Sequence, residues 1–529
     1  MSASDDSLRA GPWRTRGGQP VSLLVKLAAA AAVLIFVAFP PANFSPLAWA
    51  GLVPLILALS QLRPAQGFFV GWLFGALMMG GINYFLGTFG FLPVLAVALF
   101  LGLFYGLFGL IVAGLATVQS AGLRVVGVAA AWTLVELARG HAGPLAYTFG
   151  HLAYSQCNLL PVLQFASLMG SYGVGFLIAL TNAGLAILLL AFLPDNWYHP
   201  PSASRPQRNR AASHTMLAVY SLVFITYLWG ALIIHGAPGG APSTASLRAA
   251  AVQANVSLST PAQFHEVTAA INSYAEMSEE LPGRFDLVVW PETAIGLDIN
   301  AYPLVRNRVA GIAQKLGAHM LVGALERDNG KLYNSALLVS PQGKYLDTYR
   351  KINLVIFGEY VPVRGRWKFL ERYPLRGEDF SRGPERKIME VSGVKLGPLI
   401  CFEAIFPEPA RQVTRLGADV IVILNSDAWA ERSAELRHNS STAPLRAAEA
   451  RRYVIRAAST GISAIYDPYG RPLSDVPVNM AGVAAADVYA RRQLSTYHQW
   501  GDWPLLCICA LVLVAGLLRA HGDRQLQAG

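Results

Sequence analysis

Residues 285–292 read FDLVVWPE, and residues 394–403 read VKLGPLICFE. Each is an apolar run of the length of one buried β-strand, and each closes on a residue that can do chemistry, Glu292 or Cys401. Lys351 follows a third strand-like run at 345–349 in the same way. Sheets of α/β proteins present their reactive groups at strand ends. These stretches therefore predict a layered α/β domain with three functional candidates at its sheet edges.

Apolar runs and amphipathic segments alternate around these stretches over about 250 residues, which indicates one α/β domain. The expected strands are 248–256, 285–290, 320–325, 333–340, 345–349, 394–401, 419–424, 461–466 and 482–487, and the expected helices are 263–281, 304–316 and 443–455.

The rest of the chain has the composition of a membrane protein. Of 529 residues, 53% are hydrophobic and only 14% are charged, whereas soluble proteins carry about 25% charged residues. This excludes a disordered chain, a collagen-like chain and an ordinary soluble enzyme. Transmembrane helices need about 20 apolar residues, and we expect about eight of them. The expected spans are 23–39, 47–62, 68–86, 91–118, 123–138, 163–192, 216–235 and 503–518.

The domain organisation follows from this division. We expect a cytoplasmic tail, a membrane domain of about seven helices, a Gly/Pro/Ser-rich linker, a catalytic domain, and a last transmembrane helix with its own tail. Their bounds are 1–20, 21–236, 237–246, 247–492 and 493–529.

The net charge of +10 predicts membrane orientation and no nucleic-acid binding, because the basic residues flank apolar runs and form no stripe with interleaved aromatics. With eight spans, all but one of the flanking basic clusters fall on the side of the N-terminal arginines. The catalytic block then lies outside the cytoplasm, in the periplasm of a bacterial inner membrane. Arg139 is the exception. It follows Glu136 by one helical turn, and both an interfacial pair and a functional site remain open for these two residues.

Cysteine usage singles out Cys401. The other three cysteines, Cys157, Cys507 and Cys509, fall in the apolar part of the chain, so Cys401 has no disulfide partner in its block. A lone thiol in an oxidising compartment is a candidate nucleophile. Taken singly, the signals are weak, because a strand-end Glu is often a cap and a buried Cys is often a small hydrophobe. No His/Cys cluster has ligand spacing, so we expect no metal and no cofactor.

Four motifs taken together resemble the signature blocks of the nitrilase superfamily: WPET at 290–293, RKINLVIFGEYVP at 350–362, ICFE at 400–403 and DAW at 427–429. Three further stretches make the chain similar to that superfamily's membrane-embedded branch, the apolipoprotein N-acyltransferases. They are PANFSPLAWAGLVPLILAL at 41–59, FSRG at 380–383 and RAASTGIS at 456–463.

The resemblance implies an αββα sandwich and a catalytic triad carried over onto Glu292, Lys351 and Cys401. It implies ping-pong transfer of an acyl chain from a phospholipid, through a Cys thioester, to the N-terminal amine of the S-diacylglyceryl cysteine of an apolipoprotein. In this chemistry Glu292 is the general base, while Lys351 lowers the thiol pKa and stabilises the oxyanion. It also implies supporting roles for Glu359 and Glu403 and lid or substrate contacts by Ile356, Phe357 and Trp429. We expect a monomer.

Departures from the family pattern leave undecided which amine accepts the acyl group. Ile356 stands where the family usually has Pro, Ser426 where Asn is common, and Ala430-Glu431 where Phe-Gly is usual. These positions fall on loops and leave the triad intact. A paralogue that acylates another amine and a membrane-anchored nitrilase-type amidase therefore remain alternatives. A transporter or a non-catalytic binding protein would have no need of all three triad residue types.

Overall fold

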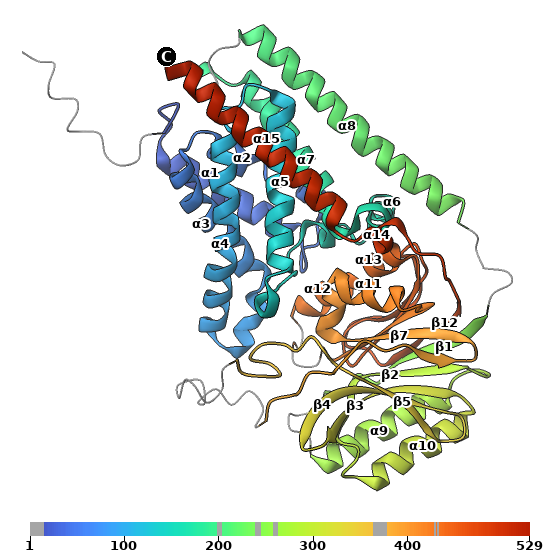
Figure 1. Ribbon diagram of the computed structural model, residues 1–529. Coiled ribbons are helices and arrows are strands. Elements are labelled where there is room, and N and C mark those ends of the chain that lie inside the picture. The colour runs from blue at the N-terminus through green and yellow to red at the C-terminus, as the bar shows by residue number, and fades with distance from the viewer. Residues whose placement is uncertain are drawn as a thin grey trace, which may run out of the picture. The chain divides into compact units, whose positions relative to one another are not determined.

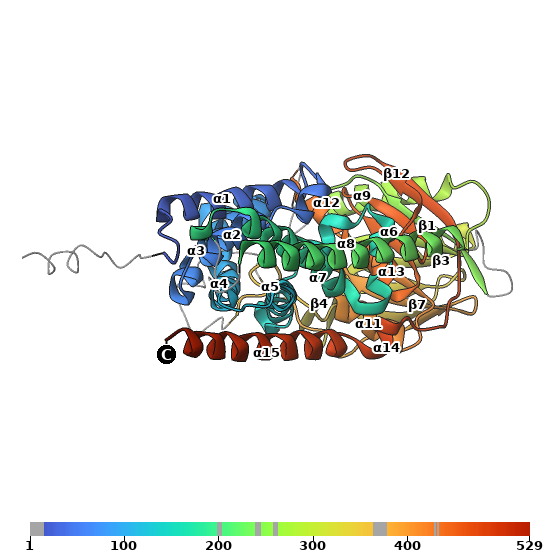
Figure 2. The ribbon, with the colours of Figure 1, turned by 90° about the horizontal axis from the view of Figure 1, so that it is seen from above.

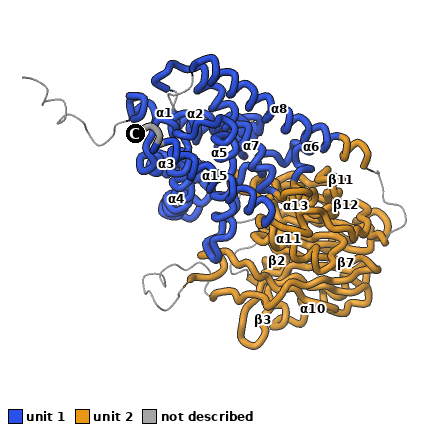
Figure 3. Tube along the Cα trace, turned by 45° about the horizontal axis from the view of Figure 1, so that its top comes forward, with its two compact units in different colours: residues 1–165, 171–231, 502–529 blue, residues 166–170, 232–501 orange. Residues whose placement is uncertain are grey.

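The computed structural model describes residues 15–197, 204–237, 245–257, 263–362, 378–427, 430 and 433–528. The chain divides into two compact units (Figure 3). Unit 1 comprises residues 1–165, 171–231 and 502–529, and unit 2 comprises residues 166–170 and 232–501. Each unit is described by itself.

Unit 1 is built from apolar helices, and six helices in its described residues are long and apolar enough to cross a membrane. These six are α3 (Pro64–Ile82), α4 (Phe91–Leu115), α5 (Ala121–Gly140), α7 (Ala166–Phe192), α8 (Arg205–His235) and α15 (Trp503–Ala528). The first five residues of α7, up to a kink at Gly170, belong to unit 2. Two of the eight expected spans contain shorter helices than these six. One is α1 (Val21–Val37), which has 17 residues, and the other is the segment 47–62.

The expected span at 47–62 is wrong as a single helix. It comprises a 3₁₀ turn (Ser45–Trp49) and the eight-residue helix α2 (Val53–Ser60). Two features break it: Pro54 has no N–H to donate, and the backbone N–H of Leu52 donates to Asn182 Oδ1 at 2.8 Å instead of to a helical carbonyl.

Glycines allow α3 and α4 to pack closely, and the two helices lie side by side in Figure 2. A Cβ atom added at Gly67 would lie 2.5 Å from the carbonyl oxygen of Gly109, and one added at Gly71 would lie 2.4 Å from that of Tyr105. Small residues at such spacing are typical of helix contacts inside membranes. Outward-facing residues of α8, such as Leu217 at 66% exposed and Phe224 at 65% exposed, are apolar as lipid contact requires.

Glu136 and Arg139 are both buried in unit 1, and the described residues show no ion pair between them. Glu136 Oε1 accepts from the N–H of Leu152 at 2.9 Å, and Arg139 Nη1 donates to the carbonyl of Phe149 at 2.9 Å. The two side chains thus bind the backbone that follows α5, which favours a structural role over an interfacial pair.

Unit 2 contains two six-stranded sheets. The first has the order β12-β1-β2-β3-β4-β5 and the second β11-β10-β9-β8-β7-β6. The strands are β1 (Ser246–Gln253), β2 (Leu287–Asp298), β3 (His319–Asp328), β4 (Lys331–Val339), β5 (Tyr345–Arg350), β6 (Met389–Val391), β7 (Val394–Ile400), β8 (Val420–Asn425), β9 (Tyr453–Ala458), β10 (Ser463–Tyr466), β11 (Pro472–Val476) and β12 (Gly482–Tyr489). The central strands, β1-β2-β3 and β7-β8-β9, are parallel, and antiparallel strands flank them.

The two sheets pack face to face and helices cover both outer faces, which gives the expected αββα sandwich (Figure 1). Alternate residues build separate cores. Ala249 and Val420 point between the sheets, Val288 points toward α9 (Phe264–Glu279) and α10 (Pro303–Leu316), and Ile421 points toward α11 (Pro407–Arg415) and α13 (Thr442–Ala450). Both faces of each sheet are buried, which explains the nearly continuous apolar runs of the parallel strands.

The expected helix at 443–455 is wrong in its second half. Helix α13 ends at Ala450, Arg451 adopts a left-handed conformation with φ 54°, and strand β9 begins at Tyr453. The β-branched pair Val454–Ile455 belongs to that strand, where branched side chains pack well. The short edge strands β6 and β11 were not anticipated.

Candidate active site

Glu292 lies at an irregularity of β2, between the β3 pairs of Trp290 and Ile295. It is 6% exposed. Its Oε1 accepts from Lys351 Nζ at 3.0 Å and Asn334 Nδ2 at 2.7 Å, and its Oε2 accepts from the N–H of Ser426 at 2.8 Å. Gly323 of β3 permits this geometry, because a Cβ there would lie 2.2 Å from the carbonyl oxygen of Pro291. Irregular strands of this kind commonly re-aim functional side chains.

Lys351 follows β5 and is 1% exposed. Its Nζ donates to Oε1 of Glu292 and to Oε1 of Glu359, both at 3.0 Å. Burial alone would lower the pKa of Lys351, but the two carboxylates, with a smaller contribution from the Cys401 thiolate form, raise it overall. The lysine therefore keeps its charge in the buried cluster and neutralises part of the charge on its two acidic neighbours.

Cys401 directly follows β7 and opens a 3₁₀ turn (Cys401–Ile405). Its backbone has φ 49°, a left-handed conformation that non-glycine residues rarely adopt. Such strain commonly marks functional turns. The thiol is free and partly exposed, and it interacts electrostatically with both Glu292 and Lys351. The fold thus brings the three expected triad residues together from β2, β5 and β7.

The net direction of the thiol pKa differs from our expectation. Desolvation raises the pKa of Cys401 well above its usual range, and Glu292 raises it further. Lys351 does lower this pKa, as expected, but its effect is smaller than those two. The resting thiol is consequently protonated at neutral pH, so a nearby base must remove the proton when the nucleophile attacks.

Glu403 ties the cysteine turn to the lysine segment. It is fully buried, and its carboxylate accepts from the N–H of Ile400 at 2.8 Å and of Ile352 at 2.9 Å. Arg386 Nη1 pairs with its Oε1 at 2.6 Å, and the Tyr349 hydroxyl donates to the same carboxylate. One buried anion thus fixes the two backbone segments that carry Cys401 and Lys351.

The loop at 352–360 contains two of the expected lid residues. Glu359 is buried at its end, and Glu359 Oε2 accepts from the N–H of Val355 at 2.9 Å, which closes the loop. Phe357 has φ 61° and is 44% exposed, while Ile356 is half-buried. Trp429, the third expected contact, lies outside the described residues.

Sequence reasoning missed Asn334 and Arg456. Asn334 is buried in β4, and its Nδ2 bridges Oε1 of Glu292 and Oε1 of Glu359 at 2.7 and 3.0 Å. Arg456 Nη2 pairs with Asp427 Oδ2 at 3.1 Å, and the N–H of Ser426, the residue before Asp427, donates to Glu292 Oε2. Two features of the sequence could have indicated them: an Asn within an apolar strand and an Arg in RAASTGIS. Buried polar side chains need partners, so each of these residues predicts a polar contact.

No group of three or more His, Cys, Asp or Glu side chains is arranged to hold a metal ion in the part of the chain that the structure describes. The site's geometry is that of an acid–base cluster around a thiol, and it suits covalent acyl chemistry.

Comparison with known proteins agrees with this geometry. Residues 248–500 match the carbon-nitrogen hydrolase family, and residues 31–184 match the apolipoprotein N-acyltransferase N-terminal domain. The chain is 31% identical to an apolipoprotein N-acyltransferase from Geobacter metallireducens over 93% of this chain and 94% of that protein. The chain belongs to the apolipoprotein N-acyltransferase family. A Pseudomonas putida apolipoprotein N-acyltransferase is 30% identical over 96% of this chain and 98% of its own length.

Among solved structures, an amidase from a Nesterenkonia species covers 49% of this chain and 94% of its own, with 20% identity and a TM-score of 0.37. Membership of the apolipoprotein N-acyltransferase family identifies the chain as an N-acyltransferase of a bacterial membrane.

Proposed function

We propose that this chain moves a fatty acyl group from a membrane phospholipid to the N-terminal amine of the S-diacylglyceryl cysteine of an apolipoprotein. The observation that carries the proposal is the buried Glu292–Lys351 pair beside a strained Cys401, in a chain with six membrane-length helices. A hydrolase of small soluble substrates needs no such helices. An acyl donor dissolved in a bilayer does need an enzyme held at its surface.

In the first half-reaction, Glu292 takes the thiol proton as Cys401 Sγ attacks the ester carbonyl of the phospholipid. The positive charge of Lys351 and a backbone N–H next to Cys401 stabilise the oxyanion of the tetrahedral intermediate. Collapse of this intermediate breaks the ester C–O bond, and Glu292 returns the proton to the departing glycerol oxygen. The products are a Cys401 thioester and a lysophospholipid.

In the second half-reaction, the acceptor amine attacks the thioester carbonyl. Glu292 removes a proton from the attacking nitrogen, and the C–S bond breaks to regenerate the Cys401 thiol and release the amide. Lys351 stays charged through both steps, because two carboxylates hold it. Glu359 shares the charge of Lys351 and keeps the lysine between the two acids, which makes it a positioning residue.

We further propose that Ile356, Phe357 and Trp429 contact the acyl chains as a lid. The exposed aromatic ring of Phe357 on the closed loop at 352–360 supports this role. The absence of polar atoms on two of these side chains suits contact with lipid rather than with water.

The membrane topology is part of the same proposal. We infer eight spans, with α1 and the Ser45–Ser60 segment completing the six longer helices, and a catalytic domain at 247–492 on the periplasmic side of the inner membrane. The flanking arginines support this orientation. The proposed tails, the membrane domain and the linker keep the bounds 1–20, 21–236, 237–246 and 493–529.

Purified full-length chain, phospholipid and a synthetic diacylglyceryl lipopeptide test the proposal. We expect lysophospholipid and N-acylated lipopeptide to form in equal amounts, and Cys401→Ala to lose both products. Mass spectrometry of the lipid and peptide fractions measures them.

Two results would contradict the proposed transfer of an acyl group to an apolipoprotein. Hydrolysis of a small amide without phospholipid, at a rate comparable to lipopeptide acylation, would favour the amidase. Acylation of a different amine in preference to the lipopeptide would favour a paralogue with another acceptor.

A further inference from the structure

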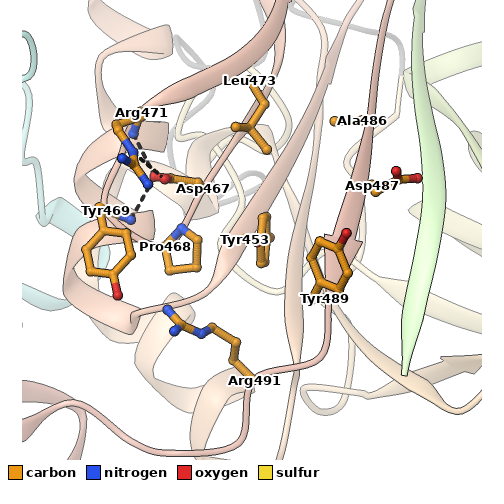
Figure 4. Close-up of a pocket in the computed structure, with 10 residues that line it drawn as sticks. All are labelled: Tyr453, Asp467, Pro468, Tyr469, Arg471, Leu473, Ala486, Asp487, Tyr489 and Arg491. Carbon is orange, nitrogen blue, oxygen red and sulfur yellow. Dashed lines mark hydrogen bonds and ion pairs between the residues drawn. The ribbon is translucent and has the colours of Figure 1, made fainter. Parts of the chain in front are cut away.

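Unit 2 contains a cavity of about 260 Å³, and its walls include Tyr453 and Arg491 (Figure 4). Tyr453, one of its walls, is the first residue of β9 and pairs with Val420, the first residue of β8. Cys401 instead follows the last residue of β7, which runs parallel to β8. The cavity therefore lies at the amino ends of these parallel strands, and the catalytic cluster lies at their carboxyl ends.

Three arginines surround one aromatic ring at this cavity. The guanidinium carbons of Arg451, Arg471 and Arg491 lie 5.0, 5.5 and 5.6 Å from the centroid of the Tyr469 ring. These distances are within the range of cation–π contacts. In Figure 4, Arg471 and Arg491 extend toward the Tyr469–Pro468 turn from two different sides. This arrangement concentrates positive charge around a single side chain.

The carboxylates nearby act on two of the three arginines, Arg471 and Arg451. Asp467 pairs with Arg471 at 2.6 Å. No ion pair joins Arg491 to a carboxylate of the described residues. Asp487 also lines the cavity, but it lies opposite Arg248 in the β1–β12 register, and Figure 4 shows its carboxylate on the far side from Arg471 and Arg491. Burial lowers the pKa of Arg451 to about 10; Tyr469 and Asp467 oppose this lowering, and Arg491 adds to it.

The cluster is rigid before any ligand binds. Oδ1 of Asp467 accepts from the backbone N–H groups of Tyr469 and Arg471, both at 2.9 Å, which fixes the turn between β10 and β11. Gly470 in this turn has φ 83°, a conformation that suits glycine. The ring of Tyr469 and the guanidinium of Arg471 are thus positioned by the backbone.

Contacts within unit 2 connect the cluster to membrane helices. Arg451 Nη2 donates to Oγ of Ser167 at 2.9 Å, and Ser167 is the second residue of the membrane-length helix α7. On the other side, Arg491 precedes Trp500, which is 64% exposed, and Trp503, which is 70% exposed and opens α15. Exposed tryptophans at the start of a span are typical of the membrane–water interface. Arg451 thus contacts the first turn of one membrane-length helix, and Arg491 is close in the sequence to the start of another.

The remaining walls of the cavity combine aromatic and apolar groups. The rings of Tyr453 and Tyr489 are 6.0 Å apart, and Leu473, at 47% exposed, lies beside the turn. Phenol hydroxyls can bind phosphate or glycerol oxygens, while ring faces and a leucine suit the apolar part of a lipid. Guanidinium groups are the side chains best matched to phosphate oxygens.

We propose that Arg451, Arg491 and Tyr469 form a binding site for the phosphate of a phospholipid headgroup, separate from the catalytic cluster. The site holds an intact lipid and performs no chemistry on it. The proposed site requires only that the chain be embedded in a membrane. It can therefore be confirmed or refuted independently of the transferase mechanism.

The test is lipid retention by the full-length chain in a non-ionic detergent, measured by native mass spectrometry with added dioleoylphosphatidylglycerol. We expect Arg491→Gln to weaken retention about tenfold, which corresponds to about 1.4 kcal/mol. Arg491→Lys should keep more of the affinity, because it keeps the charge. Arg415→Gln is the matched control, since Arg415 is exposed on α11 and does not line the cavity.

Three outcomes would overturn the proposal. The first is equal lipid retention by the Arg491→Gln and Arg415→Gln variants. The second is equal retention of dioleoylglycerol, which has no phosphate. The third is displacement of the lipid by the same concentration of inorganic phosphate, which would make this a site for free phosphate. An unfolding temperature in the same detergent that equals that of the wild-type chain verifies that each variant is folded.

Discussion

The two ends of the parallel strands in the αββα sandwich differ in how their charges are paired. At the carboxyl ends of the strands, three groups of buried charges are paired: Lys351 with Glu292 and Glu359, Glu403 with Arg386, and Asp427 with Arg456. At the amino ends, three arginines lie around the ring of Tyr469, Asp467 pairs with Arg471, and no ion pair joins Arg491 to a carboxylate of the described residues.

The two ends differ in charge pairing because they differ in solvent access, and this difference indicates what each end is suited for. Fully buried charges are tolerated only with partners, so the catalytic end is a closed set of mutually dependent groups. Arg471 and Arg491 at the other end are half-exposed, and water screens an excess of cations there. The paired end is organised for chemistry within the site, and the unbalanced end is suited to an anion from outside.

Removing a charge from the paired end should have the largest effect. Lys351→Met would leave the carboxylates of Glu292 and Glu359 buried without their shared cation. We expect a loss of stability of about 3–5 kcal/mol, together with loss of acyl transfer. Thermal unfolding of the detergent-solubilised chain measures the first, and lipopeptide acylation measures the second.

Lys395→Met is the control for this variant, because Lys395 is exposed on β7 and takes the same substitution. Equal unfolding temperatures for the two variants would show that the buried cluster does not depend on Lys351, and the contrast between the two sheet ends would disappear.

Glu403→Gln should have an intermediate effect. The amide can still accept from backbone N–H groups, but it loses the charge that pairs with Arg386 at 2.6 Å. We expect a loss of about 1–3 kcal/mol and a lower kcat, because the Cys401 turn and the Lys351 segment lose a shared anchor. Glu390→Gln on the exposed face of β6 should leave stability and kcat unchanged. A neutral result for Glu403→Gln would contradict the anchoring role.

The alkylation of Cys401 should shift with pH when Glu292 is changed. The wild-type thiol is protonated at neutral pH because desolvation and then Glu292 raise its pKa. Alkylation by iodoacetamide should therefore be slow near pH 7 and rise through the alkaline range. Glu292→Gln removes a negative neighbour, so the midpoint of this rise should move to lower pH. A midpoint that moves to higher pH, or does not move, would show that Glu292 does not act on the thiol.

Arg491→Gln should change stability least, by less than about 0.5 kcal/mol, because it removes one cation from a crowded, half-exposed group. Its unfolding temperature, compared with that of Arg415→Gln, checks this. A loss as large as that of Lys351→Met would mean that the amino end is as tightly paired as the catalytic end.

The residues at strand ends were predictable because two physical patterns coincide there. Glu292, Lys351 and Cys401 each follow an apolar run, and the family motifs surround them, so both the αββα fold and the cluster could be anticipated. The partners that hold them could not. Asn334 and Arg456 lie inside strands, and only the tertiary pairing of strands far apart in the chain brings them to the site.

The expected bounds of helices are wrong where the local sequence pattern and the tertiary packing disagree. The run at 443–452 continues as a helix-favouring sequence into Arg451 and Arg452, yet Arg451 turns the chain in a left-handed conformation and β9 pairs with β8. Likewise, 47–62 is apolar along its whole length, but the Leu52 N–H binds Asn182 and the helix is interrupted. In both cases a residue or strand far away in the sequence determines where the helix ends, and the local sequence does not reveal that partner.

The most direct test of the mechanism is the intact mass of the full-length chain after incubation with a phospholipid of defined acyl chains and no acceptor. The mechanism predicts an added mass of one fatty acyl group on Cys401, its loss on addition of a diacylglyceryl lipopeptide, and its absence in Cys401→Ala. Lipopeptide acylation that proceeds without this adduct, or that survives in Cys401→Ala, would contradict a thioester intermediate on Cys401.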